Sequence, residues 1–158
     1  MDPKDVLEQV RSQASNCTRC ELHHGRKNAV AGEGPADAEI LFIGEGPGFH
    51  ENEQGRPFVG AAGKFLEELL GKIGLSREEV FITNVVKCRP PGNRDPKPDE
   101  IDACSEYLDT QIQAINPKVI VTLGRFSMHR YLPHAKISEI HGQAFRVKGR
   151  LVVPMYHP

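Results

Sequence analysis

The stretch AEILFIGEGPG, residues 38–48, indicates a buried strand that ends in a glycine-rich turn. Its apolar half lacks the alternation of a half-exposed strand, as expected where a strand is covered on both faces. Three later runs share this pattern: VFITNVV (80–86), KVIVTLG (118–124) and RLVVPMY (150–156). Together the four runs predict one sheet with buried strands.

Helical patterns alternate with these runs. The segment AAGKFLEELLGKIGL ends its helix at Gly74, and PDEIDACSEYLDTQIQAI opens with acids that suit a helix N-terminus. Alternating strands and helices predict an α/β fold, here a three-layer α/β/α sandwich around a four-stranded parallel sheet. Because no linker or repeat interrupts residues 1–158, we expect a single domain. In the first of these helices the apolar stripe comprises Phe65, Leu66, Leu69, Leu70 and Ile73.

Length and charge exclude several classes of protein. A chain of 158 residues suits one compact domain, and no apolar run approaches the roughly 20 residues of a membrane span. The N-terminal MDPKDVLEQVRSQ lacks a signal-peptide pattern, so the expected location is the cytoplasm. A formal net charge of −1 argues against a protein that coats nucleic acid over its whole surface, but it permits a local basic patch.

Four cysteines suggest a metal centre. Cys17 and Cys20 form a C-x-x-C pair, Cys88 follows the second apolar run, and Cys104 lies on an expected helix. Four thiolates are the full complement for tetrahedral zinc or for an iron–sulfur cluster. The wide spacing of the last two suits a larger inorganic group. The alternative is a redox C-x-x-C pair with Cys104 as a buried apolar residue.

Three unusual loops follow expected strands. Parallel sheets bind ligands at the carboxyl ends of their strands, where GEGPG, NVVKCRPPGNRDP and YHP should converge. GEGPG does not match the dinucleotide fingerprint G-x-G-x-x-G, and no Walker lysine follows it. The sequence therefore disfavours a phosphate loop and favours a different ligand at this edge.

The side chains of these loops suit a flat heterocycle. Phe58 offers an aromatic face, Asn84 an amide and His157 an imidazole, while Glu45 and Glu51 add carboxylates. An asparagine oxygen can accept from N3–H of uracil while its NH₂ group donates to O4. Cytosine reverses both groups, and buried mismatches of this kind discriminate by ~10⁴-fold.

The motifs GEGPGFHENEQGRPFVGAAG, TNVVKCRPPGNRDP and MYHP resemble the three signature regions of family 4 uracil-DNA glycosylases. These are bacterial and archaeal base-excision repair enzymes that carry a [4Fe–4S] cluster. The resemblance extends from near Val10 to Pro158. It implies the superfamily fold, with a four-stranded parallel sheet between helices, and hydrolytic release of uracil from DNA.

The resemblance assigns roles to the matching positions. Phe58 would stack on the flipped uracil, Asn84 would read its N3 and O4 edge, and His157 would lie beside O2. The base and water side of the pocket would be lined by Glu45, Gly46 and Pro47. The [4Fe–4S] cluster would be held by Cys17, Cys20, Cys88 and Cys104.

The expected mechanism follows from charge. Cleavage of the N-glycosidic bond leaves negative charge on uracil and positive charge on the deoxyribose. His157 and backbone amides would stabilise the uracil anion, and Glu45 would hold the water that captures the sugar cation. Glu51 is a candidate for crowding the 5-position and excluding thymine, with a solvated loop acid as the alternative.

Basic residues predict local contact with DNA. Such patches bind phosphates with salt-dependent affinity, although each charge could equally be a solvated surface group. The expected partner is uracil-containing DNA, single- or double-stranded, and the chain is expected to be a monomer. The candidate contacts in VKCRPPGNRDPK are Lys87, Arg89, Arg94 and Lys97, and those in FRVKGR are Arg146, Lys148 and Arg150.

Two departures from the family pattern affect these expectations. The sequence ends at Pro158, so we expect it to lack the DNA-intercalating loop and the last helix of the family. The segment between Cys88 and Cys104 has no inserted basic loop with a histidine, which favours ordinary turnover over covalent trapping of DNA. Two alternatives are a non-catalytic iron–sulfur or zinc nucleic-acid-binding module, and a small-nucleotide hydrolase, which the absence of a metal-binding carboxylate set disfavours.

Overall fold

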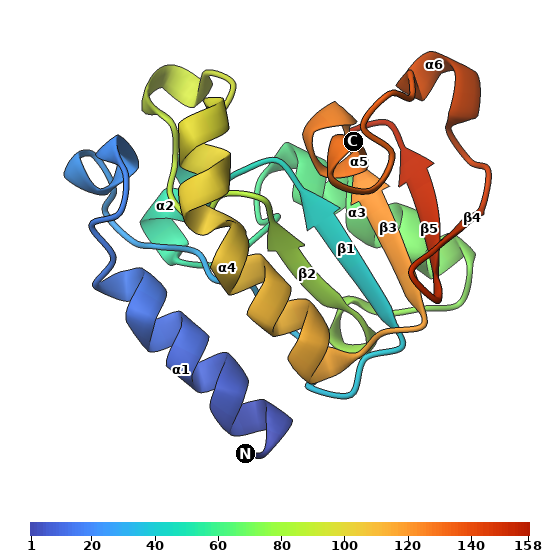
Figure 1. The fold of residues 1–158 in the computed structure, drawn as a ribbon, viewed down its shortest axis with the longest axis horizontal. Coiled ribbons are helices and arrows are strands. Elements are labelled where there is room, and N and C mark those ends of the chain that lie inside the picture. The colour runs from blue at the N-terminus through green and yellow to red at the C-terminus, as the bar shows by residue number, and fades with distance from the viewer.

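The apolar runs form neighbouring strands in a computed structural model that describes residues 1–158 (Figure 1). The strands are β1 (Ile40–Gly44), β2 (Phe81–Asn84), β3 (Val119–Leu123), β4 (Phe145–Val147) and β5 (Arg150–Met155). The α-helices are α1 (Pro3–Ser15), α2 (Phe49–Gln54), α3 (Ala61–Lys72), α4 (Pro98–Ile115), α5 (Arg125–Tyr131) and α6 (Ile137–Ile140). Three short 3₁₀ helices are η1 (Glu21–His24), η2 (Arg77–Glu79) and η3 (Pro91–Asn93).

The sheet has the strand order β2-β1-β3-β5-β4. β1 pairs in parallel with β2 and β3, and β3 pairs in parallel with β5. The predicted α/β class is confirmed, but the sheet has five strands rather than four. The added strand, β4, is antiparallel to β5 across a turn in which Lys148 and Gly149 both have positive φ. None of its three residues is buried, so no apolar run revealed it.

Helices cover both faces of the sheet. α4, with α1 beside it, covers the face nearer the viewer in Figure 1, and α3 lies behind the sheet. The core under α4 joins residues of β1 and β3, such as Ile43 and Ile120, to Leu108 and Ile112. The core under α3 joins Phe42, Phe58, Leu66, Leu70 and Ile82.

The predicted apolar stripe of α3 is only partly buried. Leu66 and Leu70 enter the core, whereas Phe65, Leu69 and Ile73 are exposed. Those three recur at every fourth position and so lie along a different line of the helix from the buried pair. None of the helices combines the length and apolar character that a bilayer crossing requires.

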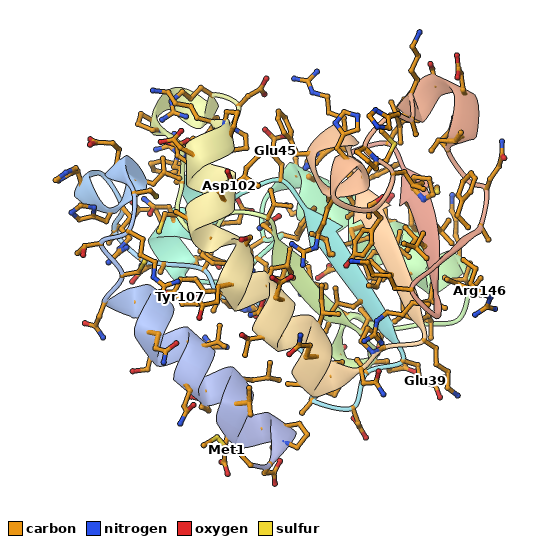
Figure 2. The ribbon with its side chains drawn as sticks, viewed as in Figure 1. Met1, Glu39, Glu45, Asp102, Tyr107 and Arg146 are labelled. Atoms are coloured by element: carbon orange, nitrogen blue, oxygen red, sulfur yellow. The ribbon has the colours of Figure 1, made fainter.

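The topology gathers the unusual loops at one edge. The four parallel strands end on the same side of the sheet, so the loops after β1, β2 and β5 are neighbours. Figure 2 labels Glu45 at this edge, just beyond the end of β1. The candidate ligand-binding residues therefore meet although they are far apart in sequence.

Candidate active site and four-cysteine centre

A cavity of about 250 Å³ opens where these loops meet. Pockets for drug-sized ligands are typically about 300–1,000 Å³, so this one suits a single nucleobase. All six residues that the resemblance assigned to uracil line it. The full lining is Glu45, Gly46, Pro47, Gly48, Glu51, Phe58, Ala62, Asn84, Pro90, Asn93, Arg94 and His157.

Asn84, the last residue of β2, carries an unpaired polar atom. Its side chain is buried, and its Oδ1 atom accepts no hydrogen bond from the chain. A buried polar atom without a partner costs about 1–3 kcal/mol, so such atoms are rare unless they serve a function. An acceptor in the wall of a base-sized cavity indicates a ligand that brings a hydrogen-bond donor.

Gly44 allows the aromatic ring and the amide to approach the sheet. A Cβ atom at this position would lie 2.5 Å from Asn84 Oδ1 and 2.6 Å from Phe58 Cζ. Phe58 is itself buried and has a φ of 50°, which is unusual for a bulky residue. A Cβ at Gly63 would fall 1.8 Å from the Phe58 carbonyl oxygen, so the start of α3 also packs directly against this residue.

Arg77 holds the backbone of Phe58 from one side. Its guanidinium donates to the carbonyl oxygens of both Pro57 and Phe58. It also pairs with Glu33, Nε to Oε2 at 3.1 Å, and Arg56 binds the same carboxylate through two hydrogen bonds. Hydrogen bonds from Arg56, with a further contribution from Arg77, hold the pKa of Glu33 below its usual range. These contacts fix the left-handed turn at Phe58.

Glu51 holds the same segment from the other side. Its Oε2 accepts from the amides of Val59 and Gly60, both at 2.9 Å, and Oε1 accepts from Gly48 at 3.0 Å. Partial burial alone would raise the pKa of Glu51, but hydrogen bonds from these amides outweigh it and lower the pKa. Glu51 is therefore an ionised wall of the cavity that joins the loop after β1 to the residues after Phe58.

Glu45 faces a second carboxylate. Burial, followed by the nearby charge of Asp95, raises the pKa of Glu45, and Arg125 opposes this shift. Arg125 Nη2 in turn donates to Asp95 Oδ2 at 2.7 Å. A carboxylate with a raised pKa is a better proton acceptor near neutral pH, so this arrangement suits Glu45 to general-base chemistry.

His157 follows β5 and lies on the exposed side of the cavity. Its ring is roughly parallel to that of Phe58, with an interplanar angle of 29° and centroids 5.9 Å apart. The backbone of Gly124 approaches it closely, since a Cβ there would lie 3.5 Å from His157 Cβ. The imidazole is thus placed beside the aromatic wall, where it can donate to a bound base.

The four cysteines line one small cavity between α1, α4 and the loop after β2. Cys88 and Cys104 are buried, and Cys17 and Cys20 are partly buried. Burial raises the pKa of Cys20 and Cys88, and raises that of Cys104 to about 11, so these three thiols are neutral at pH 7 when no metal is bound. A bound metal would have to displace these protons.

The donor set fits a group bound by four thiolates. N–H donors point at three of the sulfurs: Arg19 N at Cys17, Arg26 Nη1 at Cys88, and Lys87 N at Cys104. Such donors stabilise negative charge on sulfur. No group of three or more histidine, cysteine or acidic side chains is placed to hold a single metal ion. Four thiolates are the full complement for a tetrahedral metal ion or for an iron–sulfur cluster.

The prediction that Lys87 contacts DNA is wrong. The residue is 1% exposed, and its Nζ donates to Thr83 Oγ1 at 2.7 Å, to Asn84 O at 2.8 Å and to Gln111 Oε1 at 2.9 Å. Burial lowers the pKa of Lys87 to about 7. Charge counting could not distinguish this lysine from the exposed basic residues that follow it, because its burial depends on the path of the chain just beyond the end of β2.

The other candidate DNA contacts differ in whether they lie near the cavity. Arg89 is half-exposed near the cavity, and Arg94 lines it while binding the buried carboxylate of Glu100 through two 2.8 Å hydrogen bonds. Arg150 donates to Asn116 and Pro117 at the opposite edge of the sheet. Figure 2 places Arg146 there as well, well away from Glu45. Arg89 and Arg94 therefore remain candidates for DNA bound at the cavity, as does Lys97, an exposed residue at the N-cap of α4. Lys148 lies in the turn between β4 and β5, next to Arg146 and Arg150 in sequence.

A base-sized cavity at the carboxyl edge of a parallel sheet defines an α/β protein with a candidate ligand site at that edge. The family model of the uracil DNA glycosylase superfamily matches residues 31–158. The chain belongs to this superfamily and, within it, to the type-4 family, as its relatives indicate. The resemblance read from its motifs is thereby confirmed.

The relatives share nearly the whole chain. It is 51% identical to a type-4 uracil-DNA glycosylase of Sulfurisphaera tokodaii, over 98% of this chain and 74% of the relative. It is 47% identical to the type-4 uracil-DNA glycosylase of Archaeoglobus fulgidus, over 98% of this chain and 82% of the relative. A type-5 uracil-DNA glycosylase of Pyrobaculum aerophilum is more distant. It is 31% identical over 79% of this chain and 63% of the relative.

Three residues of the site were not predicted. Arg77 and Glu33 hold the backbone of Phe58, and Asp95 faces Glu45. Asp95 lies inside the motif NRDP, so its position after β2 could have marked it as a neighbour of Glu45. Arg77 and Glu33 carry no such signal, because their role depends on backbone carbonyl groups that no side-chain pattern reveals.

Proposed function

We propose that this chain is a uracil-DNA glycosylase, which hydrolyses the N-glycosidic bond of deoxyuridine in DNA and leaves an abasic site. The observation that carries the proposal is the unpaired Oδ1 of Asn84 in a base-sized cavity with an aromatic wall. The names of the type-4 relatives support the same activity.

Uracil would be recognised by its hydrogen-bonding edge. Asn84 would accept from N3–H and donate to O4, and Phe58 would stack on the ring. Cytosine presents the opposite donor and acceptor at these positions, so it would leave the buried amide mismatched. Thymine differs from uracil only by its 5-methyl group. Glu51, fixed by three backbone amides, would crowd that position and exclude the methyl group.

Cleavage would separate charge. As the bond between the sugar and N1 breaks, negative charge spreads over uracil and positive charge develops at C1′ of the deoxyribose. His157 would stabilise the charge on O2 by donating a hydrogen bond, an effect worth a few kcal/mol by analogy with oxyanion holes. The carboxylates of the pocket would favour the sugar cation.

Water would complete the hydrolysis. Glu45 would hold a water molecule against C1′ and take its proton as the new C–O bond forms. The uracil anion would then take a proton from solvent water, and Glu45 would return its own proton to solvent, so that one water molecule is consumed. The raised pKa of Glu45 suits this role, because a stronger base accepts the proton more readily. Residues Gly46 and Pro47 would line the same side of the pocket.

We further propose that Cys17, Cys20, Cys88 and Cys104 hold a [4Fe–4S] cluster, as the family resemblance implies. The cluster would supply a structural cross-link between α1, the loop after β2 and α4. Hydrolysis needs no electron transfer, so the cluster would act on catalysis only through the loop that follows Asn84, the last residue of β2. Arg26 and the amide of Lys87 would stabilise its sulfurs.

The partner would be uracil-containing DNA, with Arg89 and Arg94 as candidate phosphate contacts beside the cavity. We expect the chain to act as a monomer in the cytoplasm. A gel-filtration elution volume that matched a dimer at assay concentration would contradict the first part of that expectation.

The decisive experiment measures uracil release. The protein is incubated with a single-stranded oligonucleotide and with a duplex, each containing one deoxyuridine, and abasic sites are scored by alkaline cleavage. The wild-type protein should release uracil. The rate of uracil release by Asn84→Asp should be at least about 100-fold lower, since the carboxylate cannot donate to O4. A wild-type protein that binds the oligonucleotides but leaves uracil in place would favour the non-catalytic module.

A further inference from the structure

Phe49 is an exposed aromatic residue beside the cavity. It is the first residue of α2, directly after Gly48, which lines the cavity, and 52% of its surface is exposed. Neither base recognition nor hydrolysis, as proposed above, uses it. Phe49 also contributes to none of the buried cores.

The ring of Phe49 is nevertheless held in place. The guanidinium carbon of Arg89 lies 5.6 Å from its centroid, and the His50 ring is nearly perpendicular to it, with ring centroids 5.4 Å apart. Arg89 is fixed in turn, because its Nε donates to Asn93 Oδ1 at 2.7 Å, and Asn93 lines the cavity. The cation and the ring therefore form one unit at the rim, built from the loops after β1 and β2.

When uracil flips out of a DNA strand into the cavity, the bases on either side of it lose a stacking partner. Stacking of a base on an exposed aromatic side chain is worth about 1–3 kcal/mol and tolerates any base, because every base has a π face. A guanidinium beside the ring adds a positive charge for the adjoining phosphate. The Phe49–Arg89 unit has the two chemical properties that this part of the strand requires.

We propose that Phe49 is a stacking platform for the nucleobase next to the flipped uracil, with Arg89 positioning the ring and contacting the backbone phosphate. The assignment rests on the proposed function, since it needs uracil to enter the adjacent cavity. The platform belongs to the protein surface and is separate from Phe58, which is buried inside the cavity.

The test compares Phe49→Ala with wild type on two oligonucleotides. The first carries a deoxyuridine between normal nucleotides, and the second carries it between two tetrahydrofuran residues, which have no base to stack. On the first, the substitution should lower kcat/KM about tenfold. On the second, wild type and variant should have the same kcat/KM, because the stacking partner has been removed from the substrate.

Matched variants distinguish stacking from a structural effect. Phe65→Ala removes a similarly exposed aromatic from α3, at 48% exposure, and should leave kcat/KM unchanged. Phe49→Tyr keeps an aromatic face and should retain near wild-type activity. The unfolding temperature of Phe49→Ala should stay within a degree or two of wild type, since the residue is exposed.

The remaining outcomes each contradict either the stacking proposal or the proposed function. An equal loss on both oligonucleotides, or no loss on the first, would refute the stacking platform while leaving the glycosylase intact. A comparable loss in Phe65→Ala would refute it as well. Absence of uracil release by wild type on the first oligonucleotide would overturn the proposed function, and the Phe49 assignment with it.

Discussion

Gly44 is the residue at which the sheet meets both the aromatic wall and the amide of Asn84. Any Cβ here would meet Asn84 Oδ1 at 2.5 Å and Phe58 Cζ at 2.6 Å, so both groups would have to move. We expect Gly44→Ala to lower kcat/KM for uracil release by about 100-fold, because displacements of about 1 Å in a site carry costs of that order.

The control for Gly44→Ala is Gly71→Ala. Gly71 lies in α3, and a Cβ there would meet nothing within 4 Å. This second change should leave activity unaltered and stabilise the protein slightly, since alanine favours helices over glycine by up to about 1 kcal/mol. Similar activity losses in the two variants would show that the crowding at Gly44 is not the cause.

Asp95 should tune the pH dependence of the enzyme through Glu45. As the proposed base, Glu45 must be ionised to act, so its raised pKa should place the acidic limb of the kcat/KM profile at higher pH than an ordinary glutamate would. In Asp95→Asn one cause of the shift is removed while burial remains. The acidic limb should therefore move to lower pH.

Arg125→Gln provides the opposite change in the same site. Arg125 lowers the pKa of Glu45, so its loss should move the acidic limb to higher pH. Profiles measured side by side would test the sign directly. A limb that stays in place in both variants would mean that Glu45 is not the titrating base.

At the scale of residues, sequence reasoning placed side chains correctly where the strand topology alone determines their position. Phe58, Asn84, His157 and Glu45 follow strands or their loops, and the rule that ligands bind at carboxyl ends was enough to place them together. It failed for Lys87, whose charge suggested a surface. The reason is that the chain turns inward after β2 and points this lysine toward Gln111.

At the scale of elements, Lys87 connects the end of β2 to α4 through hydrogen bonds. Its ammonium joins Thr83 on β2, the carbonyl of Asn84 and Gln111 on α4. Lys87→Met would leave these acceptors short of a donor. We expect a loss of about 2–4 kcal/mol in the free energy of unfolding, measured by urea denaturation.

DNA binding separates Lys87 from the exposed arginines. The slope of log Kd against log salt should be unchanged in Lys87→Met, because a buried ammonium touches no phosphate. Arg89→Ala should reduce that slope by about one and leave the free energy of unfolding nearly constant. A reduced slope in Lys87→Met would restore the original view of this lysine as a phosphate contact.

The elements themselves were predicted with uneven success. The four apolar runs contain β1, β2, β3 and β5 with end shifts of a few residues, because buried parallel strands are continuous apolar segments. β4 and the short helices α2 and α6 had no such signal. α2 begins after Gly48 and ends at Gly55 in the left-handed conformation, so its position is set by the loop around Glu51.

At the scale of the whole molecule, the four cysteines come from segments that are remote in sequence. Cys17 and Cys20 follow α1, Cys104 lies on α4 and Cys88 lies in the loop after β2, so a bound cluster would join these segments. Cys104→Ser should lose iron and sulfide from the purified protein and lower the unfolding temperature by several degrees, because the cross-link to α4 is lost.

Ser15→Ala is the control for the cysteine substitution, since its exposed hydroxyl bonds only to Arg11 O within α1. It should retain full iron and sulfide. Stoichiometric zinc in the wild-type protein, or a Cys104→Ser variant with unchanged metal content and unfolding temperature, would contradict the cluster assignment.

The unpaired oxygen of Asn84 has a consequence for how far this fold can be stabilised. An unsatisfied buried acceptor weakens the empty protein by about 1–3 kcal/mol, which a bound base recovers when it supplies a donor. Leucine at this position would remove the deficit and so raise the unfolding temperature while abolishing recognition. Selection for thermal resistance alone would therefore work against the residue proposed to read uracil, and the two demands compete at one side chain.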